Sequence, residues 1–280
     1  MPLVPTSQIM DQAVKQRRGQ GAFNVIHLET AQAIIGGAEQ VGLPVILQIS
    51  ENCVKYHGGL HAIAAATLAL AESAEVPVAV HLDHAEDESL VYQAMDLGFG
   101  SVMFDGAKLP FEQNVAATIR VVEAAHRQGV YVEAELGEIG GKDGAHAPGV
   151  RTDPVEARHF HSLTEVDALA VAVGSSHAML ERSASLDLPL IEQLSSTLAI
   201  PVVLHGSSGV PDTTLVKAIN SGMRKINVST HLNGFFTRAV RDWLEANPGA
   251  VDSRKYVGAG RAALASEAAR LLRLFALLEH

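Results

Sequence analysis

Short apolar runs alternate along the chain with longer segments in which apolar residues recur every three or four positions. The short runs are rich in β-branched residues and contain few polar positions, which is typical of parallel strands that are buried on both faces. Eight such runs predict eight strands, at residues 21–26, 44–50, 76–82, 100–105, 130–136, 166–174, 201–205 and 223–229.

The segments between these runs have the period of a helix. Val115, Ile119 and Val122 are spaced by four and then three residues, and residues 232–244 place their apolar side chains on one stripe. Eight strand-then-helix units favour an α/β fold, the (β/α)8 TIM barrel. We expect an extra N-terminal helix at residues 6–18, a C-terminal helical extension at residues 261–278, and a single domain over residues 1–280.

Composition narrows the class of protein. The chain has 280 residues, 48% of them hydrophobic, which suits one barrel with a sizeable core. It has neither a run of 18 apolar residues nor a basic stretch followed by an apolar one at the N-terminus, so we expect no membrane span and no signal peptide. A single cysteine, Cys53, favours a reducing cytoplasm. The net charge of −10 argues against nucleic-acid binding but not against a phosphorylated substrate, because backbone N–H groups hold anions locally.

Polar residues gather where the predicted strands end. In barrels of this type the active site lies on the loops that follow the strands. The polar residues at strand ends are Asn24, Ser50, Asp83, His84, Asp105, Glu135, His177, His205 and Asn227. Packing does not explain polar groups at so many strand ends, so this end of the barrel is predicted to carry the function.

Three of these residues, His84, His177 and His205, follow three different strands. Three imidazoles can converge on one divalent ion and leave a position open for substrate. Zinc is the first choice, and cobalt, iron or manganese are alternatives. Asp83 could reach the substrate, and Glu135 could take the open position when substrate is away. The chain has 13 histidines, and a single one is more often a surface or core residue, so the prediction depends on the three together.

Two segments are suited to binding a phosphate, residues 205–211 (HGSSGVP) and residues 227–230 (NVST). Both join a predicted strand to a helix, where backbone N–H groups point outward, and they follow strands seven and eight, the recurrent phosphate site of these barrels. The alternative is that their serines and threonine only cap helices. Because His205 begins the first segment, metal and phosphate would lie within one substrate's length, which favours binding.

The segments GAFNV, HLDH, VEAELGEIGG, VDALAVAVGSSH, LHGSSGVP and KINVST, in this order, resemble the class II (zinc-dependent) fructose-bisphosphate and tagatose-bisphosphate aldolase family. The likeness covers nearly the whole chain, and the order and spacing of the histidine motifs are specific. It implies a barrel enzyme that cleaves or forms a ketose 1,6-bisphosphate, giving dihydroxyacetone phosphate and an aldehyde through a zinc-stabilised enediolate.

The resemblance also implies roles for individual residues. His84, His177 and His205 match the family's zinc ligands, and Asp83 matches its acid/base. The residues that match substrate-binding or phosphate-binding positions are Asn24, Ser50, Ala178, Gly206, Ser207, Ser208, Asn227, Val228, Ser229 and Thr230. Arg254 matches an arginine that contacts the second phosphate across a subunit interface, which implies a homodimer or homotetramer. A monovalent cation near the phosphate site is a further expectation.

The chain departs from the family pattern at several positions. Ala178 stands where the family usually has glycine. Residues 140–144 (GGKDG), in the loop 138–149, are one residue shorter than the family pattern and lack the glutamate proposed to move the C3 proton. Asp143 is our candidate for that proton transfer, and the glycine-rich loop could close over the site as a lid. Lys225 is expected to face outward, because a metal-dependent aldolase needs no Schiff-base lysine in the barrel centre.

Three alternatives remain at this level. One is an aldolase of the same family acting on an inositol-derived phospho-keto-deoxygluconate. The second is a zinc hydrolase, in which the metal would activate water. The third is a non-catalytic subunit that supports a partner aldolase, which is ranked last because all three histidines are present.

Overall fold

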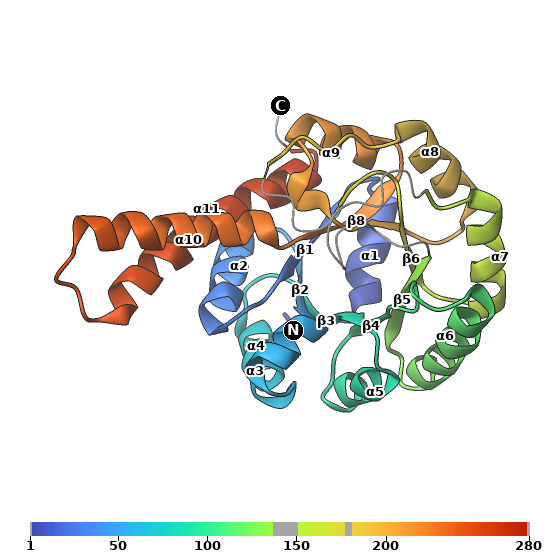
Figure 1. The fold of residues 1–280 in the computed structure, drawn as a ribbon, viewed down its shortest axis with the longest axis horizontal. Coiled ribbons are helices and arrows are strands. Elements are labelled where there is room, and N and C mark those ends of the chain that lie inside the picture. Colours follow the sequence, from blue (N-terminus) through green and yellow to red (C-terminus); the bar gives the residue numbers. More distant parts are fainter. Residues whose placement is uncertain (1, 137–150, 177–180, 279–280) are drawn as a thin grey trace.

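Eight parallel strands form a closed barrel in the computed structural model, which describes residues 2–136, 151–176 and 181–278 (Figure 1). Each strand pairs with the next along the chain, and the last pairs back to the first. The strands are β1 (Gln20–Asn24), β2 (Val45–Ser50), β3 (Val78–Ala85), β4 (Ser101–Phe104), β5 (Tyr131–Leu136), β6 (Ala168–Val171), β7 (Val202–Leu204) and β8 (Met223–Val228). The predicted (β/α)8 barrel is confirmed.

Helices surround the barrel and alternate with its strands. They are α1 (Thr6–Lys15), α2 (Leu28–Val41), α3 (Glu51–His57), α4 (His61–Ser73), α5 (Glu88–Asp96), α6 (Phe111–His126), α7 (Pro154–Thr164), α8 (Leu188–Thr197), α9 (Asp212–Asn220), α10 (Thr230–Ala246) and α11 (Ser253–Phe275), with a 3-10 turn, η1 (Ser207–Gly209). The outer part of the α10–α11 hairpin extends away from the barrel, at the left of Figure 1. None of the helices in the described part of the chain is long and apolar enough to cross a membrane.

Helix α1 closes one end of the barrel. Ile9 and Met10 of this helix are buried against Ala22, Ile46 and Ala79, which are paired neighbours inside β1, β2 and β3. Helix α1 therefore covers an apolar cluster at this end of the barrel. Because the strands are parallel, their carboxyl ends all meet at the other end of the barrel, which α1 leaves open for a site.

Several predicted boundaries shift in the structure. Strand β3 continues to Ala85, beyond the predicted end at residue 82, and its register with β4 changes between Leu82 and Ala85. Within this irregular stretch His84 has a φ of 51°, a left-handed conformation that few non-glycine residues adopt. Helix α11 begins at Ser253, well before the predicted residue 261, because Asp252 caps it by accepting a hydrogen bond from the Arg254 N–H.

The expectation that Lys225 faces outward is wrong. Its side chain is 1% exposed, and its Nζ lies 2.7 Å from Oε2 of Glu133, inside the barrel. A lysine can occupy this position because a buried carboxylate pairs with it. That counter-charge comes from β5, far from Lys225 in sequence, so a pattern along β8 does not show it.

Candidate active site

A cavity of about 490 Å³ opens at the carboxyl ends of the strands. Most of the predicted site residues line it, namely Asn24, Ser50, Asp83, His84, His205, Gly206, Ser207, Ser208, Asn227, Ser229 and Thr230. The remaining lining residues, which the sequence patterns did not single out, are Gln48, Glu51, Asn52, Lys55, Glu86 and Lys108. The structure therefore gathers the strand-end residues into one pocket.

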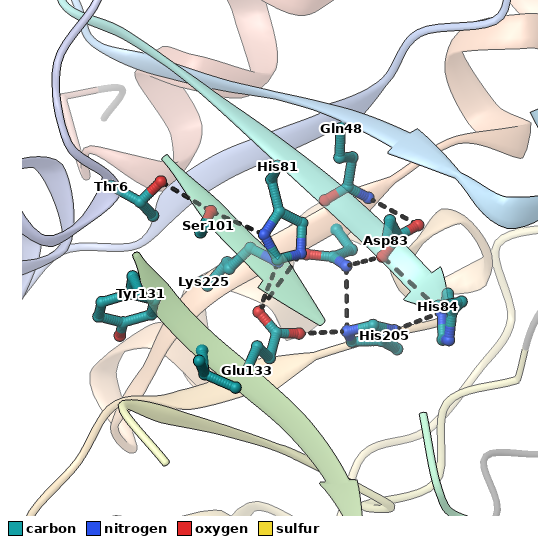
Figure 2. A network of polar contacts seen from close by, with 12 residues as sticks. Thr6, Gln48, His81, Asp83, His84, Ser101, Tyr131, Glu133, His205 and Lys225 are labelled. Carbon is teal, nitrogen blue, oxygen red and sulfur yellow. Dashed lines mark hydrogen bonds and ion pairs between the residues drawn. The ribbon is translucent and has the colours of Figure 1, made fainter. Parts of the chain in front are cut away.

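Two histidines face each other in this pocket. Nε2 of His84 lies 2.7 Å from Nδ1 of His205, and the two rings are nearly perpendicular. The outer nitrogen of each ring contacts a carboxylate. Nδ1 of His84 lies 2.7 Å from Asp105, and Nε2 of His205 lies 2.8 Å from Glu133 (Figure 2). When both carboxylates accept these N–H groups, the two facing nitrogens carry lone pairs. Two lone pairs this close repel unless a proton or a cation lies between them.

The donor set around these rings suits a divalent cation. Asp83, His84 and His205 offer ligand atoms within 4.8 Å of one another, and so do His84, Asp105 and Glu135. Glu135 is fully buried, with Oε2 3.7 Å from Nδ1 of His84. Imidazoles whose outer N–H groups are donated to carboxylates are the usual arrangement at protein metal sites. The described residues thus fit the predicted metal, with carboxylates as further candidate ligands.

The third predicted ligand, His177, lies outside the described residues, as do Ala178 and Asp143. The chain just before His177 is placed, however. Ser176 is buried against Gly206, so closely that a Cβ atom on Gly206 would lie 2.7 Å from the carbonyl carbon of Ser176. Gly206 also has a φ of 65°, where glycine is favoured. The segment that leads to His177 therefore passes directly beside the residue that follows His205.

Asp83 is held as a carboxylate by its surroundings. Its side chain is buried and accepts hydrogen bonds from three amides, those of Asn24, Gln48 and Asn227. Burial alone would raise the pKa of Asp83, but electrostatic interactions with His84, His205 and Lys225 and the hydrogen bond from Asn24 lower it to about 2. Asp83 is therefore ionised at neutral pH and able to accept a proton.

The two predicted phosphate segments lie side by side. The Ser208 hydroxyl accepts hydrogen bonds from the N–H groups of Ser229 and His231, at 3.4 and 3.2 Å, and the Ser207 hydroxyl donates to the carbonyl of Asn227. Ser229 and Thr230 line the pocket, so the start of α10 opens onto it, and the start of a helix is a place where an anion can bind. Val228 is buried and does not line the pocket, so only its backbone is near this rim.

Arg254 does not reach the pocket of its own chain. It lies in the first turn of α11 with its side chain 88% exposed, and its guanidinium pairs with Asp252 at 2.9 Å. It does not line the pocket, and none of its contacts joins it to another predicted site residue that the structure describes. Its predicted contact with substrate therefore requires a second subunit.

A chain of ion pairs lies behind the phosphate segments. Glu267 of α11 contacts His231 at 2.6 Å and Arg270 at 2.7 Å, and Arg270 and Arg182 both contact Asp212 at the start of α9. Burial would raise the pKa of Glu267, but hydrogen bonds from Arg270 and His231 lower it to about 2. These pairs tie the starts of α9 and α10 to α11.

Replacing Glu267 with glutamine is expected to remove a pH-dependent part of the stability. The folded pKa of about 2 lies below the ordinary value of 4.5, so the charge stabilises the fold above about pH 4.5 and loses that effect as the pH falls toward 2. The difference corresponds to about 3 kcal/mol. Urea unfolding should show a gap between wild type and Glu267→Gln at pH 7 that narrows by pH 3. Glu72→Gln, on the exposed face of α4, is the matched control, and a gap independent of pH would contradict the prediction.

Comparison with known proteins agrees with this geometry. Residues 4–279 match the family model described as fructose-bisphosphate aldolase class-II. The chain is 39% identical over 279 residues to a fructose-bisphosphate aldolase of Geobacillus stearothermophilus, covering 98% of this chain and 97% of that one. It is 39% identical over 268 residues to one of Staphylococcus aureus, covering 94% of each.

A solved structure has the same fold. The crystal structure of the YdjI aldolase from Escherichia coli K12 superposes with a TM-score of 0.85 at 28% identity, covering 98% of this chain and 97% of that one. The family match over nearly all of the chain and the identity to curated aldolases agree with the resemblance seen in the sequence motifs. The chain therefore belongs to the class II fructose-bisphosphate aldolase family, the metal-dependent carbon–carbon lyases.

Proposed function

We propose that the chain is a zinc-dependent aldolase that cleaves or forms a ketose 1,6-bisphosphate, with dihydroxyacetone phosphate as one product. The observation that carries the proposal is the facing pair His84 and His205, each backed by a carboxylate, in one pocket with the start of α10. This pocket combines a cation site with an anion site. A phosphorylated ketose needs both, because its carbonyl and its phosphate must be held together.

His84 and His205 would hold the metal, with His177 as the third ligand. Oε2 of Glu135 lies 4.0 Å from Nδ1 of His205, the nitrogen that faces His84, so Glu135 could occupy a vacant position. Two or three imidazoles suit zinc, while cobalt, iron and manganese accept similar sites. When bound, the ion supplies a Lewis acid that polarises the substrate carbonyl. A monovalent cation beside the phosphate and the single domain over residues 1–280 stay predictions.

Asp83 is proposed to move the proton of the reaction. As the bond between C3 and C4 breaks, the C4 hydroxyl loses its proton to a base. Asp83 is ionised, lines the pocket and is held in place by three amide donors. It would take this proton during cleavage and return it during condensation.

The rim formed by η1 and the first turn of α10 is proposed to bind the phosphate of the triose part. Gly206 allows the close backbone approach, and Ser207, Ser208, Ser229 and Thr230 surround the rim. Binding energy from this remote group positions the reacting carbons. Asn24 and Ser50, which also line the pocket, are proposed to contact the remainder of the sugar.

Truncating Ser208 to alanine is expected to raise KM for the phosphorylated ketose about tenfold, with a smaller change in kcat. The Ser208 hydroxyl holds the N–H groups of Ser229 and His231 in place and lines the pocket itself. Steady-state kinetics check this result, and Ser196→Ala on the exposed side of α8 is the control. A KM equal to that of wild type would remove Ser208 from the phosphate site.

We also propose that two or four copies of the chain assemble through the α10–α11 hairpin. The hairpin extends from the barrel and carries large exposed apolar residues, Leu244 and Val251, near its tip. Arg254 lies on the same arm with its side chain facing solvent, where it could reach the pocket of a neighbouring copy. Light scattering coupled to size-exclusion chromatography tests this assembly, and a strict monomer would contradict it.

The proposed function is tested by aldol cleavage of a panel of substrates with and without chelator. The panel contains fructose and tagatose 1,6-bisphosphate and an inositol-derived phospho-keto-deoxygluconate, and the readout is coupled detection of triose phosphate. We expect cleavage of at least one of these sugars that stops with chelator and returns with zinc. Release of inorganic phosphate without triose phosphate would point to a hydrolase, and no turnover by metal-loaded protein would point to a non-catalytic subunit.

A further inference from the structure

A line of buried polar groups runs through the barrel interior beneath the pocket. Nζ of Lys225 donates to Oε2 of Glu133 at 2.7 Å, and Oε1 of the same carboxylate lies 2.8 Å from Nε2 of His205 (Figure 2). All three side chains are at most 1% exposed. An ion pair is thus buried directly behind the proposed metal ligand.

The line continues on the far side of Lys225 to helix α1. Nε2 of His81 lies 3.5 Å from Nζ of Lys225, and Nδ1 of His81 lies 2.8 Å from the Ser101 hydroxyl, which accepts a hydrogen bond from Thr6 at 2.7 Å. Burial and the charge of Lys225 hold the pKa of His81 well below its ordinary value, so this ring is neutral. Lys225 is therefore the cation of the interior, and Glu133 is the carboxylate that balances it.

Stability of the barrel does not require such a pair. Removing a lysine and a glutamate from water costs free energy, and well-packed apolar residues in their place are often as stabilising or more so. Apolar residues surround the pair in the same layer of the interior, namely Met103, Ala168, Ala170 and Val203. Two apolar side chains in place of Lys225 and Glu133 would therefore match their neighbours. Because the pair is not needed for stability, we infer that it has a role in the site above it.

The contacts of Glu133 indicate what that role is. One carboxylate oxygen is engaged by Lys225, which leaves the other to accept the Nε2 hydrogen of His205. With the hydrogen on Nε2, the lone pair of His205 is on Nδ1, the atom that faces His84. Lys225 does not line the pocket, so it does not meet the substrate as a nucleophile.

We propose that Lys225 is a positioning residue for the metal: it holds the Glu133 carboxylate in the orientation that sets the tautomer and ring angle of His205. Its role rests on the proposed function, because it takes His205 as a metal ligand. Groups that orient metal-binding histidines typically change metal affinity 10- to 100-fold when they are removed.

The test compares zinc affinity in Lys225→Met, Glu133→Gln and the double variant, by competition with a chromophoric chelator. Methionine has a similar length but neither charge nor donor, so we expect 10- to 100-fold weaker zinc binding in Lys225→Met. Because Lys225 acts through Glu133, the double variant should bind zinc no more weakly than Glu133→Gln alone. A merely structural lysine would instead give effects that add.

Two further variants guard against misfolding. Lys225→Gln keeps an N–H donor toward Glu133 and should lose less zinc affinity than Lys225→Met. Thr6→Val, equally buried at the α1 end of the line, is the matched control, and it should lower the thermal midpoint while leaving zinc affinity unchanged. Wild-type affinity in both Lys225 variants, or additive effects in the double variant, would overturn the role of Lys225. Wild-type protein that binds no zinc would instead reject the proposed function itself.

Discussion

Replacing Asp83 with alanine is expected to lower kcat/KM for ketose bisphosphate cleavage by about 10³-fold, the range that a general base contributes. Asp83 is the ionised carboxylate in the pocket that three amides hold in a fixed orientation. Without it, the proton of the C4 hydroxyl has no acceptor in place. The coupled triose phosphate assay measures the loss directly.

The comparison with Asp83→Asn separates the proton transfer from the packing. Asparagine keeps the size of the side chain, and its oxygen can accept the hydrogen bonds that Asn24 and Gln48 give to Oδ2. It loses the one that Asn227 gives to Oδ1, and it takes up no proton at neutral pH. Both variants should retain zinc, since the proposed ligands are the histidines. Asp87→Ala, at the exposed N-cap of α5, is a nearby carboxylate control that should keep its activity. Full activity in Asp83→Asn would remove Asp83 from the mechanism.

The sequence was sufficient for the barrel and for the end that carries the pocket. Each strand-then-helix unit is local, so its hydrophobic period predicts it without knowledge of distant contacts. Parallel strands meet at one end of a barrel, so polar residues such as Asn24, Asp83 and His205 at different strand ends had to gather there. These two inferences depend on geometry that all such barrels share.

The polar barrel interior was not predicted, and the reason is physical. Strands buried on both faces show no alternation of apolar and polar residues, so the sequence does not separate inward from outward positions. A usable signal was nevertheless present. Side chains two residues apart point to the same side of a strand. Four interior groups lie two positions before a strand-end residue of the predicted site, in the pairs Gln48 and Ser50, His81 and Asp83, Glu133 and Glu135, and Lys225 and Asn227.

The differences between predicted and observed structure at the end of β3 and at the start of α11 have a different origin. The backbone of His84 is left-handed within an irregular stretch of β3, and such a feature depends on contacts with β4 rather than on the residues around His84. Likewise the start of α11 at Ser253 puts Arg254 on a helix of the extended arm, where its position relative to any pocket depends on a second subunit. Neither feature is encoded in a periodic pattern.

Replacing His205 with alanine is expected to abolish stable zinc binding and to lower kcat/KM by at least about 10³-fold. Loss of the Lewis acid removes several kcal/mol of stabilisation from the transition state, and each 1.4 kcal/mol is a factor of ten. His205 is fully buried and faces His84 at 2.7 Å, so its loss removes one of the two imidazoles that the structure places at the proposed metal site. Metal content after desalting, measured by atomic absorption, checks the first part of this prediction.

Rescue of His205→Ala by free imidazole is a stricter test of His205 as a metal ligand, because the substitution leaves a cavity of the size of the ring. Free imidazole added to His205→Ala can enter the open pocket and should restore part of the zinc content and of the cleavage rate, because it supplies the missing ligand without a covalent tether. His126→Ala, which removes a half-exposed ring paired with Asp167, should neither lose zinc nor respond to imidazole. If His205→Ala kept its full zinc content, the ion would have to be bound elsewhere, and the facing pair of rings would need another explanation, such as a shared proton.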